Sequence, residues 1–179
     1  MKNKIQYSYD DINLSKIKMI IFDFDGIFTN NKVTLNQDGI ESVTCDRRDG
    51  IAIEVLRNYQ NKYNKNMDIL VISSERNSVV QKRCDKLNIK YINGVKNKLE
   101  VLKNNYKNIL DGKGIIFFCN DINDIKLQEF VEWSIVPKDA HKIIKENANF
   151  ISELRGGECF IRLSIEDIMG IENFIELYF

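Results

Sequence analysis

The sequence has little of several residue types on which common kinds of site depend. Its 179 residues include one histidine, one proline and four cysteines. A catalytic pair of histidines is therefore excluded, and a Ser-His-Asp triad would have to include His141. The cysteines, which form no CxxC pair, are Cys45, Cys84, Cys119 and Cys159. This spacing suits neither a zinc site nor a disulfide scaffold, so we predict reduced and mostly structural thiols.

The sequence also lacks a surplus of charge and a long apolar run. It has 26 Lys and Arg residues against 26 Asp and Glu residues, so no positive surplus attracts it to nucleic acid. Apolar runs such as residues 19–24 are far shorter than the roughly 18 residues that span a bilayer. Residues 1–10 lack the apolar core of a signal peptide. We expect a cytoplasmic protein with no nucleic-acid partner and no membrane contact.

What is present predicts one α/β domain over residues 1–179. Apolar runs of strand length alternate with longer segments of helical period, which is typical of βαβ units around a parallel sheet. An Asn-Gln-Asp-Gly turn at 36–39 lies between two short strand-like runs and predicts a β-hairpin. We predict a Rossmann-like parallel sheet with helices on both faces and a small hairpin flap at about residues 30–46. The expected strands are 18–24, 68–73, 90–92, 114–120 and 133–136, and the expected helices are 51–59 (opened by Asp49 as N-cap), 79–87, 98–106, 124–131, 141–146 and one from about 158.

Polar residues follow several of these predicted strands. Asp23 and Asp25 come after the first strand, Ser73-Ser74-Glu75-Arg76 follow the second, and residues 120–124 follow the strand at 114–120. Lys98 opens a helix. Because the carboxyl ends of parallel strands meet at one edge of a sheet, we expect these side chains to gather there.

This set of side chains suits the cleavage of a phosphate monoester. An ionised Asp23 can attack phosphorus without a general base, and Asp25 can protonate the leaving group and then activate water. Ser73 and Lys98 can bind the phosphoryl oxygens. Oxygen atoms of Asp23, Asp25 and Asp121 are suitable ligands for Mg²⁺, which screens carboxylate from phosphate.

The same residues form a recognisable series of motifs. Residues 22–29, Phe-Asp-Phe-Asp-Gly-Ile-Phe-Thr, resemble the first motif of haloacid dehalogenase-like phosphatases, and Ser73, Lys98 and residues 120–124 stand where the later motifs belong. Further segments resemble one capless subfamily over residues 18–162, namely 48–50, 94–99, 136–141 and 155–158. That subfamily includes 3-deoxy-D-manno-octulosonate 8-phosphate phosphatases, phosphatases of nine-carbon sialic-type acids, and the C-terminal domains of CMP-sialic acid synthetases.

The resemblance implies a Mg²⁺-dependent phosphatase of a small phosphorylated sugar acid. It implies a homotetramer in which the flap helps to close a neighbour's active site. Asn120 joins Asp23, Asp25 and Asp121 as an implied metal ligand. Arg155 is implied to bind the sugar carboxylate, for which a guanidinium is well shaped. The other residues placed near the substrate are Thr29, Arg48, Ser74, Glu75 and Asp124.

Two positions depart from the octulosonate phosphatase pattern. The fourth motif usually reads Gly-Asp-Asp, whereas this chain has Cys119-Asn120-Asp121, so one metal carboxylate is replaced by an uncharged amide. Glu75 resembles the phosphatases of nine-carbon acids and favours a nonulosonate 9-phosphate, whereas Arg48 and His141 favour an octulosonate 8-phosphate. One alternative is a catalytically weakened domain that serves oligomerisation or partner binding in CMP-sialic acid synthesis, and another is a broad sugar phosphatase.

Structural roles compete with several of these assignments. Ser73 and Asp124 could cap helices, Lys98 could be an ordinary solvated lysine, and Glu75 and Arg155 could be surface residues. His141 fits a helix start better than a catalytic role.

Overall fold

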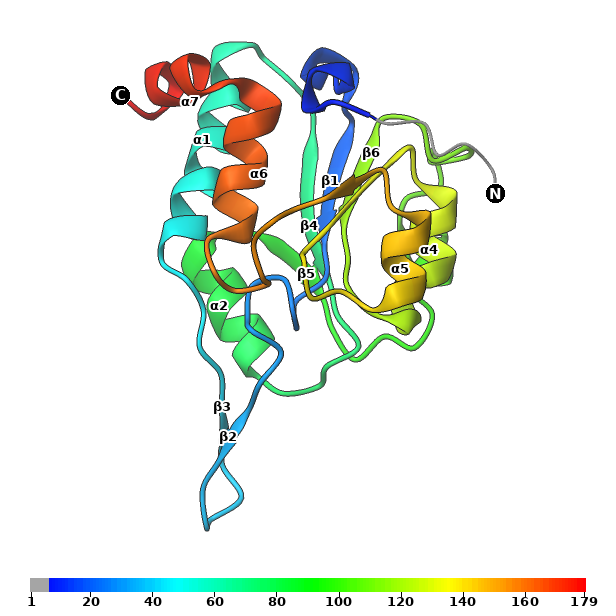
Figure 1. The fold of residues 1–179 in the computed structure, drawn as a ribbon. Coiled ribbons are helices and arrows are strands. Elements are labelled where there is room, and N and C mark those ends of the chain that lie inside the picture. The colour runs from blue at the N-terminus through cyan, green and yellow to red at the C-terminus, as the bar shows by residue number, and fades with distance from the viewer. Residues whose placement is uncertain (1–6) are drawn as a thin grey trace.

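A six-stranded parallel sheet forms the centre of the molecule (Figure 1). The computed structural model describes residues 7–179, so the first six residues of the predicted domain lie outside the described part. The strand order is β5-β4-β1-β6-β7-β8. The strands are β1 (Met19–Phe22), β4 (Asp68–Ile72), β5 (Lys90–Ile92), β6 (Ile115–Phe118), β7 (Trp133–Val136) and β8 (Phe150–Ile151). The predicted fold class is confirmed.

Helices cover both faces of this sheet. One face packs against α1 (Arg48–Lys62), α2 (Val79–Leu87), α6 (Phe160–Met169) and α7 (Ile171–Tyr178). The other face packs against α3 (Lys98–Asn105), α4 (Ile125–Phe130) and α5 (Lys142–Asn147). Short 3₁₀ helices are η1 (Tyr9–Asp11), η2 (Leu14–Lys16) and η3 (Ile122–Asp124). Among the described residues, no helix is both long and apolar enough to cross a membrane.

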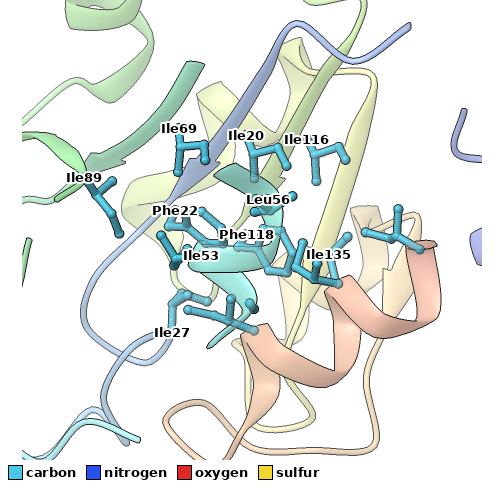
Figure 2. Close-up of a cluster of buried hydrophobic side chains, with 14 of the residues drawn as sticks. Ile20, Phe22, Ile27, Ile53, Leu56, Ile69, Ile89, Ile116, Phe118 and Ile135 are labelled. Atoms are coloured by element: carbon cyan, nitrogen blue, oxygen red, sulfur yellow. The ribbon is translucent and has the colours of Figure 1, made fainter. Parts of the chain in front are cut away.

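Alternate residues of each central strand contribute to opposite apolar clusters. Ile20 and Phe22 of β1 face α1 and α6 together with Phe118 of β6, and Figure 2 shows them beside Ile53 of α1. Met19 and Ile21, by contrast, belong to the cluster under α3, α4 and α5. A strand buried on both faces reads as an unbroken apolar run, which explains why β1 and β6 were predictable.

The predicted hairpin projects from the body of the molecule (Figure 1). Its strands β2 (Thr34–Leu35) and β3 (Glu41–Ser42) are shorter than the strand-like runs 32–35 and 40–45 in the sequence. A further bridge joins Thr29 to Cys45 at the base of the hairpin. Every residue from 30 to 42 is exposed. We use the name flap for residues 30–46.

Other boundaries differ from the sequence prediction in instructive ways. The helix α1 begins at Arg48, so the prediction that Asp49 is its N-cap is wrong, and Asp49 lies inside the helix. The last helix is divided into α6 and α7 at Gly170, which has a φ of 75°. The two-residue strand β8 was not predicted. All four cysteines are free thiols, as expected.

Candidate active site

The ends of three adjacent strands place their polar residues together. Asp23 follows β1, Ser73 follows β4 and Asn120 follows β6, and β1 lies between the other two strands. A cavity of about 200 Å³ opens here, lined by Asp23, Asp25, Ser73, Ser74, Glu75 and Asn123. A larger hollow of about 540 Å³, beside Met19 and Asp68 at the opposite ends of the strands, holds none of the predicted site residues. The predicted site residues therefore gather at the smaller cavity.

Lys98 lies between the carboxylates of Asp23, which lines this cavity, and Asp124, and we call these three residues the cavity floor. Its Nζ is 2.6 Å from Asp23 Oδ1 and 2.6 Å from Asp124 Oδ1, and all three side chains are buried. Burial alone would lower the pKa of Lys98, but the two carboxylates outweigh it and raise that pKa. Lys98 is therefore a fixed positive charge and not a solvated surface lysine.

Asp23 is held in one orientation by its surroundings. Its Oδ1 also accepts a hydrogen bond of 2.7 Å from the Phe24 amide, and its own amide donates to the Phe118 carbonyl. Burial raises the pKa of Asp23 to about 7, the Lys98 ammonium opposes this rise, and Asp124 adds to it. The arrangement presents one carboxylate oxygen next to a cation at the carboxyl end of β1.

Asp25 stands two residues further on and is half-buried. Burial raises its pKa, the neighbouring Glu75 carboxylate adds to the rise, and a hydrogen bond of 3.3 Å from the Thr29 hydroxyl opposes it. A raised pKa favours the protonated form, which a proton donor needs. We name residues 23–29 the acid loop.

Asn120 has a buried side-chain oxygen that could serve as a ligand. Among residues 7–179, its Oδ1 has no hydrogen-bond partner although the residue is only 6% exposed, and such groups are rare in folded proteins. Within residues 7–179, no group of three or more His, Cys, Asp or Glu side chains could hold a metal ion. A cation here would have to use the Asn120 amide oxygen and a backbone oxygen beside carboxylates. Hard divalent cations accept such mixed oxygen ligands, so the residues present fit Mg²⁺.

Ser73, Ser74 and Glu75 line the cavity from the end of β4. The Ser73 hydroxyl accepts a hydrogen bond of 3.0 Å from the Glu75 amide and is buried, so it could still donate its proton towards the cavity. The Glu75 carboxylate accepts hydrogen bonds from the amides of Arg76 and Asn77. These contacts fix the turn, and Glu75 stays at the rim of the cavity.

Thr29 and Asp124, which the resemblance places near the substrate, both have fully buried side chains. The Thr29 hydroxyl contacts Asp25 and accepts from the Gly26 amide. The Asp124 carboxylate holds Lys98 and accepts from the amides of Asn120 and Asp121. These contacts hold the side chains of Asp25 and Lys98 in position.

Asp121, Arg48, Arg155 and His141 lie outside the cavity lining. The Asp121 carboxylate accepts from the Ile122 amide and caps η3. The Arg48 side chain is 61% exposed and pairs with Asp46, and Arg155 is exposed. His141 is the N-cap of α5. Lys98 and Asn120 do not line the cavity either. Two members of this outer group lie beside Asn120, because the His141 amide donates to the Asn120 carbonyl at 2.8 Å and the Asp121 amide donates to Asp124.

A glycine pair packs tightly against the acid loop. The Gly157 amide donates to the Ile27 carbonyl at 3.0 Å, and a Cβ at Gly156 would overlap the Gly26 carbonyl oxygen. Gly26 has a φ of 77°, and a Cβ there would overlap the Asn120 side chain. The glycines are therefore required for close approach around the site.

Two further residues near the cavity were not predicted as site residues. Asn123 lines it and donates from Nδ2 to the Ser74 hydroxyl at 3.0 Å. Glu41 of the flap accepts a hydrogen bond of 3.1 Å from Asn77, which links the flap to the turn after β4. Asn123 belongs to the predicted segment 120–124, but both contacts join segments far apart in sequence, so no local pattern indicated these partners.

Comparison with known proteins gives consistent results. No family model matches the chain. It is similar to the 3-deoxy-D-manno-octulosonate 8-phosphate phosphatases of Salmonella typhi (23% identical over 148 residues, 82% of this chain and 76% of the relative) and Yersinia pestis (22% over 175 residues, 93% and 88%).

Solved structures show the same fold. A protein from Streptomyces avermitilis assigned to the haloacid dehalogenase hydrolase family matches with a TM-score of 0.81 at 28% identity, covering 90% of both chains. The octulosonate phosphatase of Moraxella catarrhalis, solved with a magnesium ion, a phosphate ion and a KDO molecule, matches with a TM-score of 0.80 at 22% identity, covering 91% of this chain and 92% of that one. The fold, the ordered motifs and these likenesses together support placing the chain in the haloacid dehalogenase-like superfamily, beside the 3-deoxy-D-manno-octulosonate 8-phosphate phosphatases.

Proposed function

We propose that the chain is a Mg²⁺-dependent phosphatase that hydrolyses the terminal phosphate of a 3-deoxy-2-keto sugar acid through an aspartyl-phosphate on Asp23. The observation that carries this proposal is the buried contact of Asp23 with Lys98 at the carboxyl end of the central strand. A carboxylate and an ammonium placed 2.6 Å apart suit a nucleophile and a group that stabilises charge on the phosphoryl oxygens. The names of the sequence relatives support the same reaction class.

In the first step, an Asp23 carboxylate oxygen attacks phosphorus and the bond from phosphorus to the ester oxygen breaks. The electron pair of that bond goes to the ester oxygen, which takes a proton from Asp25 and leaves as an alcohol. The raised pKa of Asp25 favours the protonated form that this step needs.

In the second step, water attacks the aspartyl-phosphate while the Asp25 carboxylate accepts a water proton. The bond from phosphorus to the Asp23 oxygen breaks, which frees inorganic phosphate and restores Asp23. Lys98 and Ser73 hold the phosphoryl oxygens in both steps. Asp23, the Asp25 backbone carbonyl and Asn120 would hold Mg²⁺, with Asp121 as a further proposed ligand, and the bound ion supplies charge neutralisation between carboxylate and phosphate.

The proposed leaving group is a sugar acid, and a nonulosonate 9-phosphate is favoured over an octulosonate 8-phosphate. Glu75 supports the nine-carbon choice, because its carboxylate at the rim can accept hydrogen bonds from hydroxyl or acylamino groups. Arg155 is the proposed partner of the sugar carboxylate, because it is exposed and a guanidinium can pair with a carboxylate through two hydrogen bonds. Rates with one octulosonate 8-phosphate and two nonulosonate 9-phosphates at saturating Mg²⁺ would decide between the substrates.

We propose a homotetramer in which the flap contributes to a neighbour's site. Three apolar side chains of the flap support this assembly, because Val33, Leu35 and Ile40 are 58%, 62% and 64% exposed. Analytical ultracentrifugation of the full chain tests it, and a monomer at all concentrations would contradict it.

The second candidate function is a phosphatase-like domain that serves assembly or partner binding. Asn120 favours it, because the amide removes one negative charge from the metal site. A scaffold should show no Mg²⁺-dependent turnover on any sugar-acid phosphate. Retention of Asp23, Lys98 and Asp124 in buried contact favours the enzyme.

The decisive experiment replaces the nucleophile. Asp23→Asn keeps the shape of the side chain but removes its charge, so phosphate release should fall below detection while circular dichroism stays unchanged. Asp85→Asn is the matched control, because Asp85 is exposed on α2. An Asp23→Asn variant that released phosphate at the wild-type rate would overturn the proposed mechanism.

A further inference from the structure

A buried carboxylate outside the cavity caps a helix that is distant in sequence. Asp49 is the second residue of α1, it is 0% exposed, and its Oδ1 accepts a hydrogen bond of 3.0 Å from the Arg162 amide in the first turn of α6. The residue before α6, Cys159, is in the left-handed region with a φ of 65° and makes no side-chain cap. Asp49 therefore satisfies an amide that the segment preceding α6 leaves open.

A second contact ties the end of the flap to the start of α6. Asp46, at the last position of the flap, accepts a hydrogen bond from the Cys159 amide. Its carbonyl accepts a second one of 2.8 Å from Arg83 of α2. Two carboxylates three residues apart thus hold the N-terminus of α6.

The segment that enters α6 packs directly on the acid loop. Gly157 donates to the Ile27 carbonyl, and Gly156 lies too close to Gly26 for any side chain. Thr29 ends the acid loop, its hydroxyl contacts Asp25, and its backbone pairs with Cys45 of the flap. The base of the flap, the start of α6 and Asp25 therefore form one continuous set of contacts.

We propose that Asp49 is a positioning residue for Asp25: by capping α6 it fixes the glycine segment against the acid loop and so sets the position of the Asp25 carboxyl group. This inference rests on the proposed function, because it assumes that Asp25 donates a proton to the leaving group. Asp49 does not line the cavity, and neither does Arg162, whose amide donates to it.

The proposal predicts that the loss of kcat/KM on removal of Asp49 depends on the leaving group. An alkoxide must be protonated as it leaves, whereas p-nitrophenolate is stable without a proton. The parameter kcat/KM reports the steps up to formation of the phosphoenzyme, so it isolates the transfer in which Asp25 acts as an acid. Loss of Asp49 should therefore lower kcat/KM for an alkyl phosphate much more than for p-nitrophenyl phosphate.

The experiment compares three variants of the full chain on a nonulosonate 9-phosphate, the favoured substrate, and on p-nitrophenyl phosphate at saturating Mg²⁺. Asp49→Ala should lower kcat/KM about 10- to 100-fold on the sugar-acid phosphate, and less than about threefold on the aryl phosphate. Asp49→Asn keeps an oxygen acceptor for the Arg162 amide and should recover most of the activity. Burial raises the pKa of Asp49 to about 7, so a neutral side chain is tolerated there. Ile168→Val is the matched control, because it weakens the buried far end of the same helix and should lower neither rate.

The outcomes separate failure of this inference from failure of the proposed function. Equal losses on both substrates in Asp49→Ala would show a general structural role and would overturn the inference. A wild-type protein without Mg²⁺-dependent turnover on either substrate would overturn the proposed function instead. If Asp49→Ala is poorly folded, the milder variant Asp49→Ser replaces it, with Asp49→Asn again as the comparison. The measure is the ratio of kcat/KM on the sugar-acid phosphate to kcat/KM on the aryl phosphate. A ratio in Asp49→Ser equal to that of the wild type would also contradict the inference.

Discussion

The floor of the cavity and the flap have opposite relations to solvent. Lys98 contacts both Asp23 and Asp124, and all three residues are between 0% and 4% exposed. By contrast, Val33, Leu35 and Ile40 of the flap are more than half exposed. Charges inside the protein act strongly because little water screens them, and each one needs its partner. Apolar side chains on a projecting hairpin gain burial only when another surface covers them. We therefore propose that one chain carries the groups for bond cleavage, and that selection of the substrate depends on the surface that covers the flap.

The largest expected effect comes from breaking the buried charge cluster. Lys98→Met leaves the carboxylates of Asp23 and Asp124 buried without a cation, so we expect a loss of about 3–5 kcal/mol in unfolding free energy. Loss of the charge on the phosphoryl oxygens should also lower kcat by about 10²–10³-fold. Urea unfolding and steady-state kinetics measure the two effects. Lys96→Met, which removes an exposed lysine from the same region, is the control and should change neither.

The buried Asp49 extends the comparison to pH. Burial raises its pKa to about 7 in the folded protein, the Arg162 amide lowers it and Asp46 raises it. The folded state binds the Asp49 proton more tightly than the unfolded chain does. The contribution of protonated Asp49 to the unfolding free energy is therefore fully present below about pH 4 and is lost as the pH rises through 7. Over that pH range, the unfolding free energy of the wild type should therefore fall by at most about 4 kcal/mol relative to that of Asp49→Asn.

Unfolding free energies of both proteins at pH 4.5, 6 and 8 check this effect. The difference between the two proteins isolates Asp49, because every other titrating group is shared. A difference that is constant with pH would show that the carboxyl group has the same pKa in the folded and unfolded states.

Sequence patterns predicted those parts of the molecule that depend on local signals. The bounds of α2, β5 and β7 agree with the prediction, and the unbroken apolar run of β1 correctly indicated a buried carboxylate at its end. The role of Asp49 escaped prediction, because its partner Arg162 lies 113 residues further along the chain. An Asp-Gly pair before an apolar helical pattern reads as a local cap, and only tertiary packing turns this side chain towards α6. The burial of Thr29 and Asp124 was not predicted either, although most of their partners are local, because a sequence pattern does not show how deeply a polar side chain is packed.

Asn120 offers a way to sharpen the comparison by adding a charge beside the cavity floor. Asn120→Asp restores a carboxylate to the proposed metal site, so the Mg²⁺ concentration for half-maximal activity should fall about tenfold. Without metal the added charge lies near Asp23 and Asp124, so the melting temperature of the metal-free protein should fall. Activity titrations and thermal unfolding with and without Mg²⁺ measure both effects.

Asp121→Asn is the matched control for this titration. The Asp121 carboxylate caps η3, and asparagine is an equally good cap, so the Mg²⁺ dependence should stay unchanged if capping is its only role. A Mg²⁺ requirement raised as far as Asn120→Asp lowers it would instead support Asp121 as a metal ligand.

The smallest expected effect on stability comes from the flap. The triple change Val33→Ser, Leu35→Ser and Ile40→Ser removes apolar groups that are already in water, so unfolding free energy at low protein concentration should change by less than about 0.5 kcal/mol per site. Ile20→Ala in β1, a fully buried position, should cost about 2–5 kcal/mol and is the contrasting core variant. If the flap contacts a second copy of the chain, the triple variant should sediment as a smaller species. It should also show a raised KM for the sugar-acid phosphate and an unchanged rate on p-nitrophenyl phosphate. Equal sedimentation of the wild type and the triple variant would show that these side chains do not form the contact between copies. The remaining contact of the flap with the turn after β4 would then be the one between Glu41 and Asn77 of its own chain.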